Sequence, residues 1–238
     1  MALINGTSLE VTSLSAIAHI LEHAPERGVA LSIMESGPAR VQSLVSLAKE
    51  KGVEIRPMRS GEPVLKVKPF EFKDWDFIEA LSTEKTGMVV VLDHIQDPQN
   101  FGAIVRSAEA FGVKAVIIPK DRSVTVTPAV YTASAGAVET LAIVQVTNVS
   151  DRIARLKKDG FWIVGAHKGE KATDPWKIPT FEKIALVMGT EFEGLRPSVI
   201  AACDWISAIP MKGQIESLNV SAACAVLLYE LNARRGAN

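Results

Sequence analysis

Residues 88–112 read MVVVLDHIQDPQNFGAIVRSAEAFG, and the order of apolar and polar residues in this stretch indicates a strand, a turn and a helix. The apolar run at its start has no polar alternation, which is typical of a strand buried on both faces. Pro98 suits the first turn of the helix, and Asp97 and Asn100 are candidate N-terminal caps. An ordinary turn of this kind needs one cap and one glycine. The additional polar residues therefore indicate either a binding site or a crowded helix start.

Five further apolar runs follow, mostly separated by helical patterns, and they read KAVIIP, LAIVQVT, FWIVGA, KIALVMG and DWISAIP. Together they predict an α/β fold, with a mainly parallel sheet and helices on both of its faces. Ligands of such sheets bind at the carboxyl ends of the strands. Three turns at those ends are rich in glycine and polar residues, namely DHIQDPQNFG, GTEFEGL and PMKGQIESLN. These three loops predict a functional site at one edge of the sheet.

The chain before residue 87 has a different pattern. Residues 1–60 contain two helical segments, SLEVTSLSAIAHILEH and PARVQSLVSLAKEKG, and two short strands, VALSIM and VEIRPM, which predict a small α/β domain. In residues 61–86 the stretch VLKVKPFEF predicts one exposed strand or an extended linker, and DWDFIEAL predicts a short helix. We therefore expect domains at residues 1–60 and 87–238, joined by a linker at 61–86.

The composition limits the class of protein. The 238 residues include 26 Lys plus Arg and 27 Asp plus Glu, so any nucleic-acid site must be a local basic patch. Cys203 and Cys224 lie in apolar segments without a CxxC pattern, and the four histidines lack metal-ligand spacing, so no metal site is expected. No segment predicts a membrane span or a signal peptide, and we expect a soluble cytoplasmic chain.

Residues in the three loops allow both a structural and a functional interpretation. Arg106 lies among apolar neighbours of a helix, and it either extends to solvent or clamps an anion. Glu191 and Glu193 are either loop charges or site residues, and Ser217 or Asn219 either caps the last helix or belongs to a site. No GxGxxG follows a strand, which argues against a nicotinamide dehydrogenase.

Taken together, the three loops resemble the three signature motifs of the SpoU/TrmH branch of the SPOUT RNA methyltransferases. DPQNFGAIVRSAEAFG is similar to the first motif, LVMGTEFEGL to the second and IPMKGQIESLNVSAA to the third. Three motifs in the family's order are very specific, and the resemblance covers about residues 87–235. IIPKDR and TASAGAVE resemble the RlmB-like members, which methylate a guanosine ribose in 23S ribosomal RNA. Residues 2–58 resemble the L30e-like domain that binds substrate in many members.

The resemblance implies a C-terminal trefoil knot, S-adenosylmethionine as cofactor, and a homodimer with its active site close to the subunit interface. It implies that the second and third motifs form the cofactor pocket, through Met188, Gly189, Thr190, Ile209, Pro210 and Leu218. It also implies a set of catalytic residues, which are Asn100, Arg106, Glu191, Ser217 and Asn219.

The implied reaction is a displacement in which a ribose 2′-oxygen attacks a methyl group on a sulfonium. Alignment of the two reactants contributes up to about 7–11 kcal/mol, and a general base contributes roughly 10²–10⁴-fold. Asn100 and Asn219 suit positioning because an amide is both donor and acceptor. Arg106 is the base proposed in the family, but a guanidinium with a pKa above ~12 rarely gives up a proton. Clamping the phosphate next to the target ribose suits Arg106 better, with a phosphate oxygen or water as proton acceptor.

Basic residues near the domain junction and in the PKDR segment are candidate contacts to RNA phosphates, and they are Arg56, Arg59, Lys66, Lys68, Lys120 and Arg122. Solvated surface charge is the alternative for each. Two other functions stay open: the same chemistry on tRNA, and a catalytically idle RNA-binding or ribosome-assembly protein with the same fold. The tRNA-specific members usually lack the first domain, and an idle site has no physical need for all five candidate catalytic residues.

Overall fold

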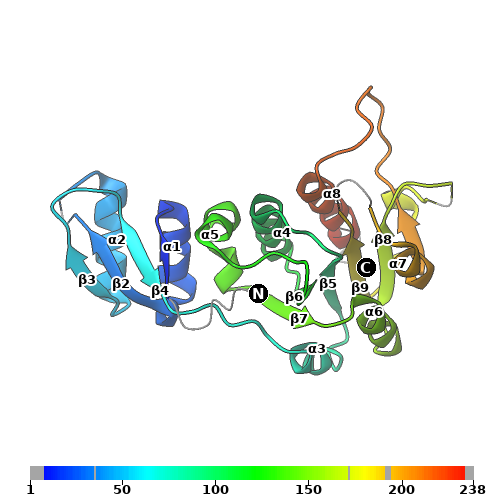
Figure 1. The fold of residues 1–238 in the computed structure, drawn as a ribbon, viewed down its shortest axis with the longest axis horizontal. Coiled ribbons are helices and arrows are strands. Elements are labelled where there is room, and N and C mark those ends of the chain that lie inside the picture. Colours follow the sequence, from blue (N-terminus) through cyan, green and yellow to red (C-terminus); the bar gives the residue numbers. More distant parts are fainter. Residues whose placement is uncertain (1–7, 35, 171, 191–193, 234–238) are drawn as a thin grey trace.

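The computed structural model describes residues 8–34, 36–170, 172–190 and 194–233, which form two α/β units side by side (Figure 1). The first unit has a four-stranded sheet in the order β1-β4-β2-β3, formed by β1 (Leu9–Val11), β2 (Gly28–Ile33), β3 (Glu54–Pro57) and β4 (Val64–Val67). β2 and β3 are parallel, whereas β4 is antiparallel to both of its neighbours. Its helices are α1 (Leu14–His23), α2 (Ala39–Glu50) and the short 3₁₀ helix η1 (Pro25–Arg27).

β4 lies in the stretch VLKVKPFEF, which was predicted as either one exposed strand or an extended linker. Leu65 and Val67 are fully buried, whereas Lys66 between them is exposed, because successive side chains of a strand point to opposite faces. β4 pairs with β1 on one side and β2 on the other. The predicted strand is therefore present, but it is a buried inner strand and not an exposed one, and the first sheet extends beyond residue 60. The resemblance of this unit to an L30e-like domain stays a prediction.

The second unit has a six-stranded sheet in the order β10-β8-β9-β5-β6-β7. Its strands are β5 (Gly87–Leu92), β6 (Ala115–Pro119), β7 (Ala142–Val146), β8 (Trp162–Ala166), β9 (Lys183–Met188) and β10 (Trp205–Ser207). All five neighbouring pairs are parallel, which confirms the predicted mainly parallel sheet. The helices are α3 (Asp76–Leu81), α4 (Pro98–Ala110), α5 (Pro128–Ser134), α6 (Val149–Lys158), α7 (Pro197–Ala202), α8 (Val220–Ala233), η2 (Ala137–Glu139) and η3 (Pro175–Lys177).

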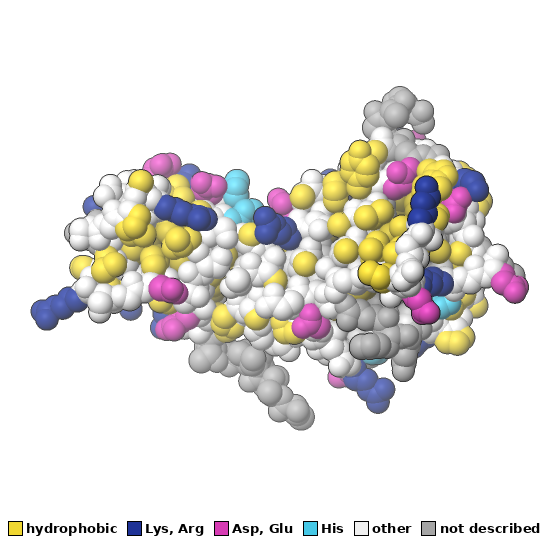
Figure 2. Space-filling model, turned by 90° about the horizontal axis from the view of Figure 1, so that it is seen from above, with side chains coloured by type: hydrophobic (Ala, Val, Ile, Leu, Met, Phe, Trp, Pro, Cys, Tyr) yellow, Lys and Arg dark blue, Asp and Glu magenta, His cyan; other side chains and the backbone are white. Residues whose placement is uncertain are grey.

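Helices cover both faces of this sheet, as the uninterrupted apolar runs predict. In β5, Met88, Val90 and Leu92 pack in one apolar cluster with α4, α5 and α8, whereas Val89 and Val91 pack in another with α3, α6 and α7. Figure 1 shows α4, α5 and α8 on one side of the sheet and α3 and α6 on the other. Figure 2 looks onto the layer of α4, α5 and α8, and hydrophobic side chains are concentrated over its α8 end.

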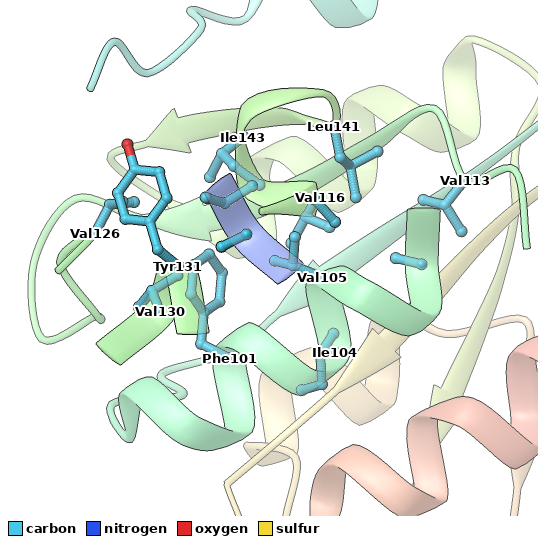
Figure 3. Packing of buried hydrophobic residues seen from close by; sticks show 14 of the residues in the cluster. Phe101, Ile104, Val105, Val113, Val116, Val126, Val130, Tyr131, Leu141 and Ile143 are labelled. Carbon is cyan, nitrogen blue, oxygen red and sulfur yellow. The ribbon is translucent and has the colours of Figure 1, made fainter. Parts of the chain in front are cut away.

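α4 packs tightly against α5, which fixes the helix that follows the first polar loop. Phe101 of α4 lies next to Val130 and Tyr131 of α5 in the cluster (Figure 3). A Cβ atom at Gly102 would lie 2.5 Å from the Cβ atom of Ala133, so no side chain fits between the two helices. The glycine at this position therefore allows the close approach of α4 and α5.

A buried ion pair joins the two units. Nε of Arg27, in η1, donates to Oε2 of Glu139, in η2, at 2.8 Å, and Nη2 donates to the carbonyl oxygen of Pro69 at 2.6 Å. The Tyr131 hydroxyl donates to the other oxygen of Glu139, whose side chain is only 3% exposed. Burial alone would lower the pKa of Arg27, but the charge and hydrogen bond of Glu139 outweigh it and raise this pKa. The first unit is thus fixed to α5 and η2 of the second.

The order of the strands reverses between β5 and β9. From β5 the chain continues to β6 and β7 on one side, whereas β9 has β8 and β10 on its other side. In open parallel sheets, ligands bind at the carboxyl ends of the strands at such a switch point. The first polar loop follows β5 and the second follows β9, so the topology brings these two predicted loops together. The C-terminal knot stays a prediction. None of the helices in the described ranges has the length and apolar character of a membrane span.

Candidate active site

The loop after β9 begins at Gly189, where the backbone of another segment comes very close. A Cβ atom at Gly189 would lie 2.1 Å from the carbonyl oxygen of Gly194. The N–H of Thr190 donates to the oxygen of Gly194 at 3.1 Å, and the N–H of Gly194 donates to the oxygen of Thr190 at 3.0 Å. Gly194 has a φ of +66°, in the left-handed region that glycine adopts readily. The predicted catalytic residue Glu191, and Glu193 with it, lie outside the described residues.

A cavity of about 360 Å³ lies at the carboxyl ends of β8, β9 and β10, and we call it the first cavity. Five of the six residues predicted to bind the cofactor line it, namely Met188, Gly189, Thr190, Ile209 and Leu218. Pro210 follows Ile209 on the exposed surface and is not part of this lining. Ser217, a predicted catalytic residue in the third loop, also lines the first cavity.

The lining of the first cavity fits S-adenosylmethionine, which has an adenine ring, an ammonium, a sulfonium and a carboxylate. Cavities that hold small molecules have volumes of about 300–1,000 Å³ and are mostly apolar with a few polar groups. Ile209, Leu218 and Leu227 provide apolar contacts, and the backbone at Gly189 approaches without a side chain. Charged side chains complementary to a carboxylate and an ammonium come from Lys168 and Glu216. The residues present therefore fit this cofactor.

A second cavity, of about 530 Å³, adjoins the first. The two share Thr190, Gly194 and Val220 in their linings. The remaining wall of the second cavity comes from the loop after β5 and from two arginines, with Asp93, His94, Ile95, Gln96, Asp97, Asn100, Arg122 and Arg196. A ligand in one cavity would lie next to a ligand in the other, as the transfer of a group between two substrates requires.

Asn100 and Asn219 connect the first and third loops. Nδ2 of Asn219 donates to Oδ1 of Asn100 at 2.8 Å. Oδ1 of Asn219 accepts from the backbone N–H groups of Ser221 at 2.9 Å and Ala222 at 3.4 Å, at the start of α8. The N–H of Asn100 donates to Oδ2 of Asp97, the N-cap of α4, at 2.8 Å. Asn219 therefore caps α8, as the structural interpretation predicts, and also contacts Asn100.

Arg106 lies on an exposed side of α4 and lines neither cavity. It follows Asn100 by six residues, which places the two side chains about 120° apart around a helix with 3.6 residues per turn. Among the residues that the structure describes, none forms a hydrogen bond or an ion pair with its guanidinium. Within a single chain the Arg106 side chain thus extends to solvent. If it clamps an RNA phosphate, it does so outside the two cavities.

Three residues of the second cavity were not singled out from the sequence. Nε of Arg196 donates to Oδ2 of Asp93 at 2.9 Å, and its Nη2 donates to Oδ1 at 2.7 Å. Nδ1 of His94 lies 2.7 Å from Oδ1 of the same carboxylate. Asp93 is only 2% exposed, and His94 has a φ of +67°, which is uncommon for residues other than glycine. The sequence does give one indication of this group, namely that Asp93 directly follows a buried strand. A buried carboxylate needs charged or hydrogen-bonding partners.

Of the six basic residues predicted to contact RNA, Arg122 lines the second cavity and the other five do not. Nε2 of Gln96 donates to the carbonyl oxygen of Arg122 at 3.4 Å. Arg56 is exposed on β3, where its Nε donates to Oε1 of Glu54 at 2.8 Å. The remaining four residues are exposed side chains of the first unit or follow β6, and they are Arg59, Lys66, Lys68 and Lys120.

Thiol and metal chemistry have no visible site in the described residues. In these ranges, no group of three or more His, Cys, Asp or Glu side chains is arranged to hold a metal ion. Burial raises the pKa of Cys224 to about 12. Burial and the charge of Asp204 raise the pKa of Cys203 to about 12 as well, so both thiols stay protonated at neutral pH.

The parallel sheet has two adjoining cavities at its switch point, as in α/β proteins that bind ligands there. Comparison with known proteins identifies the class. Residues 87–229 match the SpoU rRNA Methylase family, and the chain belongs to this family. A curated relative from Coxiella burnetii, the 23S rRNA (guanosine-2′-O-)-methyltransferase RlmB, is 39% identical over 241 residues. The alignment covers 95% of this chain and 96% of the relative, so it includes both units.

Solved structures share the fold. The SpoU methyltransferase AviRb from Streptomyces viridochromogenes, in complex with the cofactor AdoMet, has a TM-score of 0.78 and 23% sequence identity. That likeness covers 97% of this chain and 92% of AviRb, so the two proteins have a similar fold over both units. The A. aeolicus TrmH/SpoU tRNA modifying enzyme has a TM-score of 0.58 and 27% identity, over 65% of this chain and 79% of that enzyme.

Proposed function

We propose that this chain is an S-adenosylmethionine-dependent methyltransferase that methylates the 2′-hydroxyl of a guanosine ribose in 23S ribosomal RNA. The observation that carries the proposal is the shared wall of the two cavities, one fitted to the cofactor and the other lined by amide and basic side chains. Membership of the SpoU rRNA methylase family and the similarity to RlmB over nearly the whole chain support the same reaction and substrate.

The residues between the cavities position the acceptor ribose. When bound, S-adenosylmethionine supplies a methyl group on a positively charged sulfur. The hydrogen bond from Asn219 fixes the orientation of the Asn100 amide, which lines the second cavity. An amide held in this way can keep the ribose oxygen in line with the first cavity, and alignment of this kind contributes up to about 7–11 kcal/mol. Ser217, in the lining of the first cavity, is a further donor or acceptor on the cofactor side.

We further propose a homodimer in which Arg106 acts close to the subunit interface. The neighbouring helix α8 has two exposed hydrophobic side chains, Val226 at 44% and Tyr229 at 61% exposure. The ring of Tyr229 contacts the ring of Phe111, which follows α4, with 6.1 Å between their centroids. Exposed apolar patches are typical of protein interfaces, and Figure 2 shows hydrophobic side chains concentrated over the α8 end. In a dimer built on this surface, Arg106 lies beside the partner and the RNA that both subunits bind.

The first unit favours ribosomal RNA over tRNA as the substrate. RlmB from Coxiella burnetii is similar over both units, whereas the likeness to the A. aeolicus tRNA modifying enzyme covers 65% of this chain. The ion pair between Arg27 and Glu139 fixes the first unit beside the second, so both can contact one RNA. We also propose that the enzyme works in the cytoplasm, which a ribosomal RNA substrate supports.

The test uses purified protein, methyl-labelled S-adenosylmethionine, and separate pools of unmodified 23S, 16S and transfer RNA. We expect label in 23S RNA, at a nucleotide whose 3′ phosphodiester resists alkaline hydrolysis because its 2′-oxygen is methylated. Arg106→Ala should abolish this label and still bind the cofactor, because Arg106 is outside the first cavity. Arg155→Ala is the matched control, since Arg155 is a half-exposed arginine of α6 that lines neither cavity.

The other outcomes separate the parts of the proposal. Label in tRNA alone would keep the reaction and overturn the substrate. Cofactor binding without label in any pool would point to a pre-ribosomal particle as the substrate. Absence of cofactor binding would favour the catalytically idle RNA-binding protein. Loss of cofactor affinity in Arg106→Ala would contradict the assignment of Arg106 to the RNA substrate.

A further inference from the structure

We infer that Arg196 and His94 bind the RNA phosphate next to the acceptor ribose in the second cavity, and that Asp93 positions both side chains. This inference rests on the proposed function, because it names the contact that holds the RNA there. Neither Arg196 nor His94 belongs to the residues that the three motifs suggested.

Asp93 is the fixed point of this group. It follows β5 directly, is 2% exposed, and accepts from Nε and Nη2 of Arg196 at 2.9 and 2.7 Å. Nδ1 of His94 lies 2.7 Å from Oδ1 of the same carboxylate. Charge-assisted hydrogen bonds to a carboxylate are short and directional, and two from one guanidinium define its plane. Asp93 therefore fixes the directions of both basic side chains.

The remaining donors are accessible from the second cavity. A guanidinium has five N–H donors, and Asp93 accepts from two of the nitrogen atoms of Arg196. The Arg196 side chain is 46% exposed and lines the cavity, as His94 does. Within the described part of the chain, Nη1 of Arg196 and Nε2 of His94 have no hydrogen-bond partner. These two nitrogen atoms are thus available to a ligand in the cavity.

The side-chain donors of the cavity favour an anion, although its two aspartates balance its two arginines in formal charge. Three basic side chains line it, namely His94, Arg122 and Arg196, and the acidic ones are Asp93 and Asp97. Asp93 is engaged by Arg196, and Oδ2 of Asp97 accepts from the N–H of Asn100. The planar donors of arginine match the oxygen atoms of a phosphate, and protein contacts to RNA phosphates fix the register of the chain. The phosphates on either side of the acceptor ribose are therefore the ligands that this wall fits.

The backbone at His94 supports a functional role for its side chain. Its φ of +67° is in the left-handed region, which residues other than glycine adopt at a cost in free energy. Arg122, across the same cavity, has a φ of +52°. Two basic residues with left-handed backbones thus line one cavity. The hydrogen bond from the Gln96 side chain to the Arg122 carbonyl oxygen stabilises the backbone of Arg122. Such strained positions concentrate at functional sites.

The decisive variants are Arg196→Met and Asp93→Asn, with Arg155→Met as the matched control. RNA affinity is measured with unmodified 23S RNA over a range of salt concentrations, in the presence of S-adenosylhomocysteine. The slope of log affinity against log salt is negative, and we expect Arg196→Met to make it less steep by about 0.7–0.9. At physiological salt it should weaken RNA binding about tenfold, as the loss of a charge-assisted hydrogen bond does. Asp93→Asn keeps the charge of Arg196, so its salt slope should equal that of the wild type.

A purely structural ion pair gives a different pattern. If Arg196→Met and Asp93→Asn had the same effect on RNA affinity and salt slope, the pair would only stabilise the loop and the inference would be wrong. A wild-type slope in Arg196→Met would also overturn it. His94→Asn covers the case in which Arg196→Met does not fold, because Asn tolerates the left-handed backbone and the ion pair stays intact. It should raise the KM for RNA about threefold with kcat and cofactor affinity unchanged, as for a single weak contact, and an unchanged KM counts against the inference.

Failure of the inference differs from failure of the proposed function. Should the wild-type protein neither bind S-adenosylmethionine nor methylate any RNA pool, the proposed function is wrong. Should it methylate 23S RNA while Arg196→Met keeps the wild-type KM and salt slope, the reaction stands and the phosphate contact does not.

Discussion

The side-chain nitrogen of Asn219 donates a hydrogen bond of 2.8 Å to the side-chain oxygen of Asn100, although the two residues are 119 positions apart. Asn100 lies in the first turn of α4, and Asn219 directly precedes α8. Both helices cover the same face of the second sheet. One contact therefore connects the loop that lines the second cavity with the loop that contributes Ser217 and Leu218 to the first.

Asn219→Asp separates this contact from the capping of α8. Aspartate caps a helix as well as asparagine does, so its carboxylate still accepts from the N–H groups of Ser221 and Ala222. It cannot donate to Asn100. We expect the free energy of unfolding to change by less than about 0.5 kcal/mol, and turnover to fall about 100-fold because the acceptor is misplaced.

Thermal unfolding and methyl transfer to 23S RNA measure the two effects. Asn219→Ala is the comparison, because it removes the cap as well and should cost about 1 kcal/mol of stability. Wild-type turnover in Asn219→Asp would show that the contact between the two amides has no catalytic importance.

Gly189→Ala tests the close approach of the backbone beside the first cavity. The new Cβ atom would lie 2.1 Å from the carbonyl oxygen of Gly194, so the segments on both sides of the contact must move apart. Since Gly189, Thr190 and Gly194 all line the first cavity, we expect cofactor affinity to fall at least about tenfold, as for a loss of about 1.4 kcal/mol.

Isothermal titration calorimetry with S-adenosylmethionine measures the effect of Gly189→Ala. Gly213→Ala is the matched control, because a Cβ atom at Gly213, in the third loop, has no heavy atom within 4 Å. Equal cofactor affinity in the two variants would contradict the role of the Gly189 contact.

Tyr229→Glu tests the proposed dimer surface on α8. Tyr229 is 61% exposed in the single chain, and a carboxylate at this position costs little there. At a buried interface the same charge would be desolvated without a partner, which costs several kcal/mol. We expect the variant to be a folded monomer by sedimentation velocity with much lower activity, because Arg106 would lose its neighbouring subunit. Glu230→Gln, one residue further along α8, is the control for a change of charge on this helix. A Tyr229→Glu variant with the wild-type sedimentation coefficient would exclude this surface as the interface.

The sequence predicts most of the second unit because its signals are local. Each of the six apolar runs becomes a strand, and the position of a polar loop at the end of a strand fixes the edge of the sheet at which it lies. The assignment of Gly189 and Leu218 to one pocket came from the resemblance of the second and third loops to the family's motifs, and both residues line the first cavity. The short strand β4 was misjudged because its partners, β1 and β2, are far away in the sequence.

Long-range side-chain pairs explain the rest of what was missed. Arg196 contacts Asp93 across 103 positions, and no periodicity in either segment relates the two residues. The exposure of Arg106 could not be predicted either. The sequence pattern of an arginine in an apolar segment is the same whether its side chain points to a cleft or to solvent. Both features depend on how the helices turn around their axes after packing.

Histidine at the junction of the two units predicts a pH dependence of stability. Nε2 of His19, in α1, lies 3.1 Å from Oγ1 of Thr140, which follows η2. Burial lowers the pKa of His19 from its ordinary value of 6.5, and the charge of His23 lowers it further, against weaker opposing effects of Glu109 and Glu22. The folded protein therefore binds this proton less readily than the unfolded chain does.

The sign of the effect follows from this lowered pKa. Above pH 6.5, His19 is neutral in both states and costs no stability, whereas below 6.5 the unfolded chain takes up the proton first. Stability should thus decrease as the pH falls through 6.5, and it should level off below the pKa of the folded state. Thermal unfolding between about pH 7.5 and pH 5.5 measures the decrease. His19→Gln keeps an uncharged hydrogen-bonding group, so part of the decrease should disappear, whereas His167→Gln, outside this junction, serves as the matched control. If His19→Gln loses as much stability in acid as the wild type, protonation of His19 does not weaken the contact between the two units.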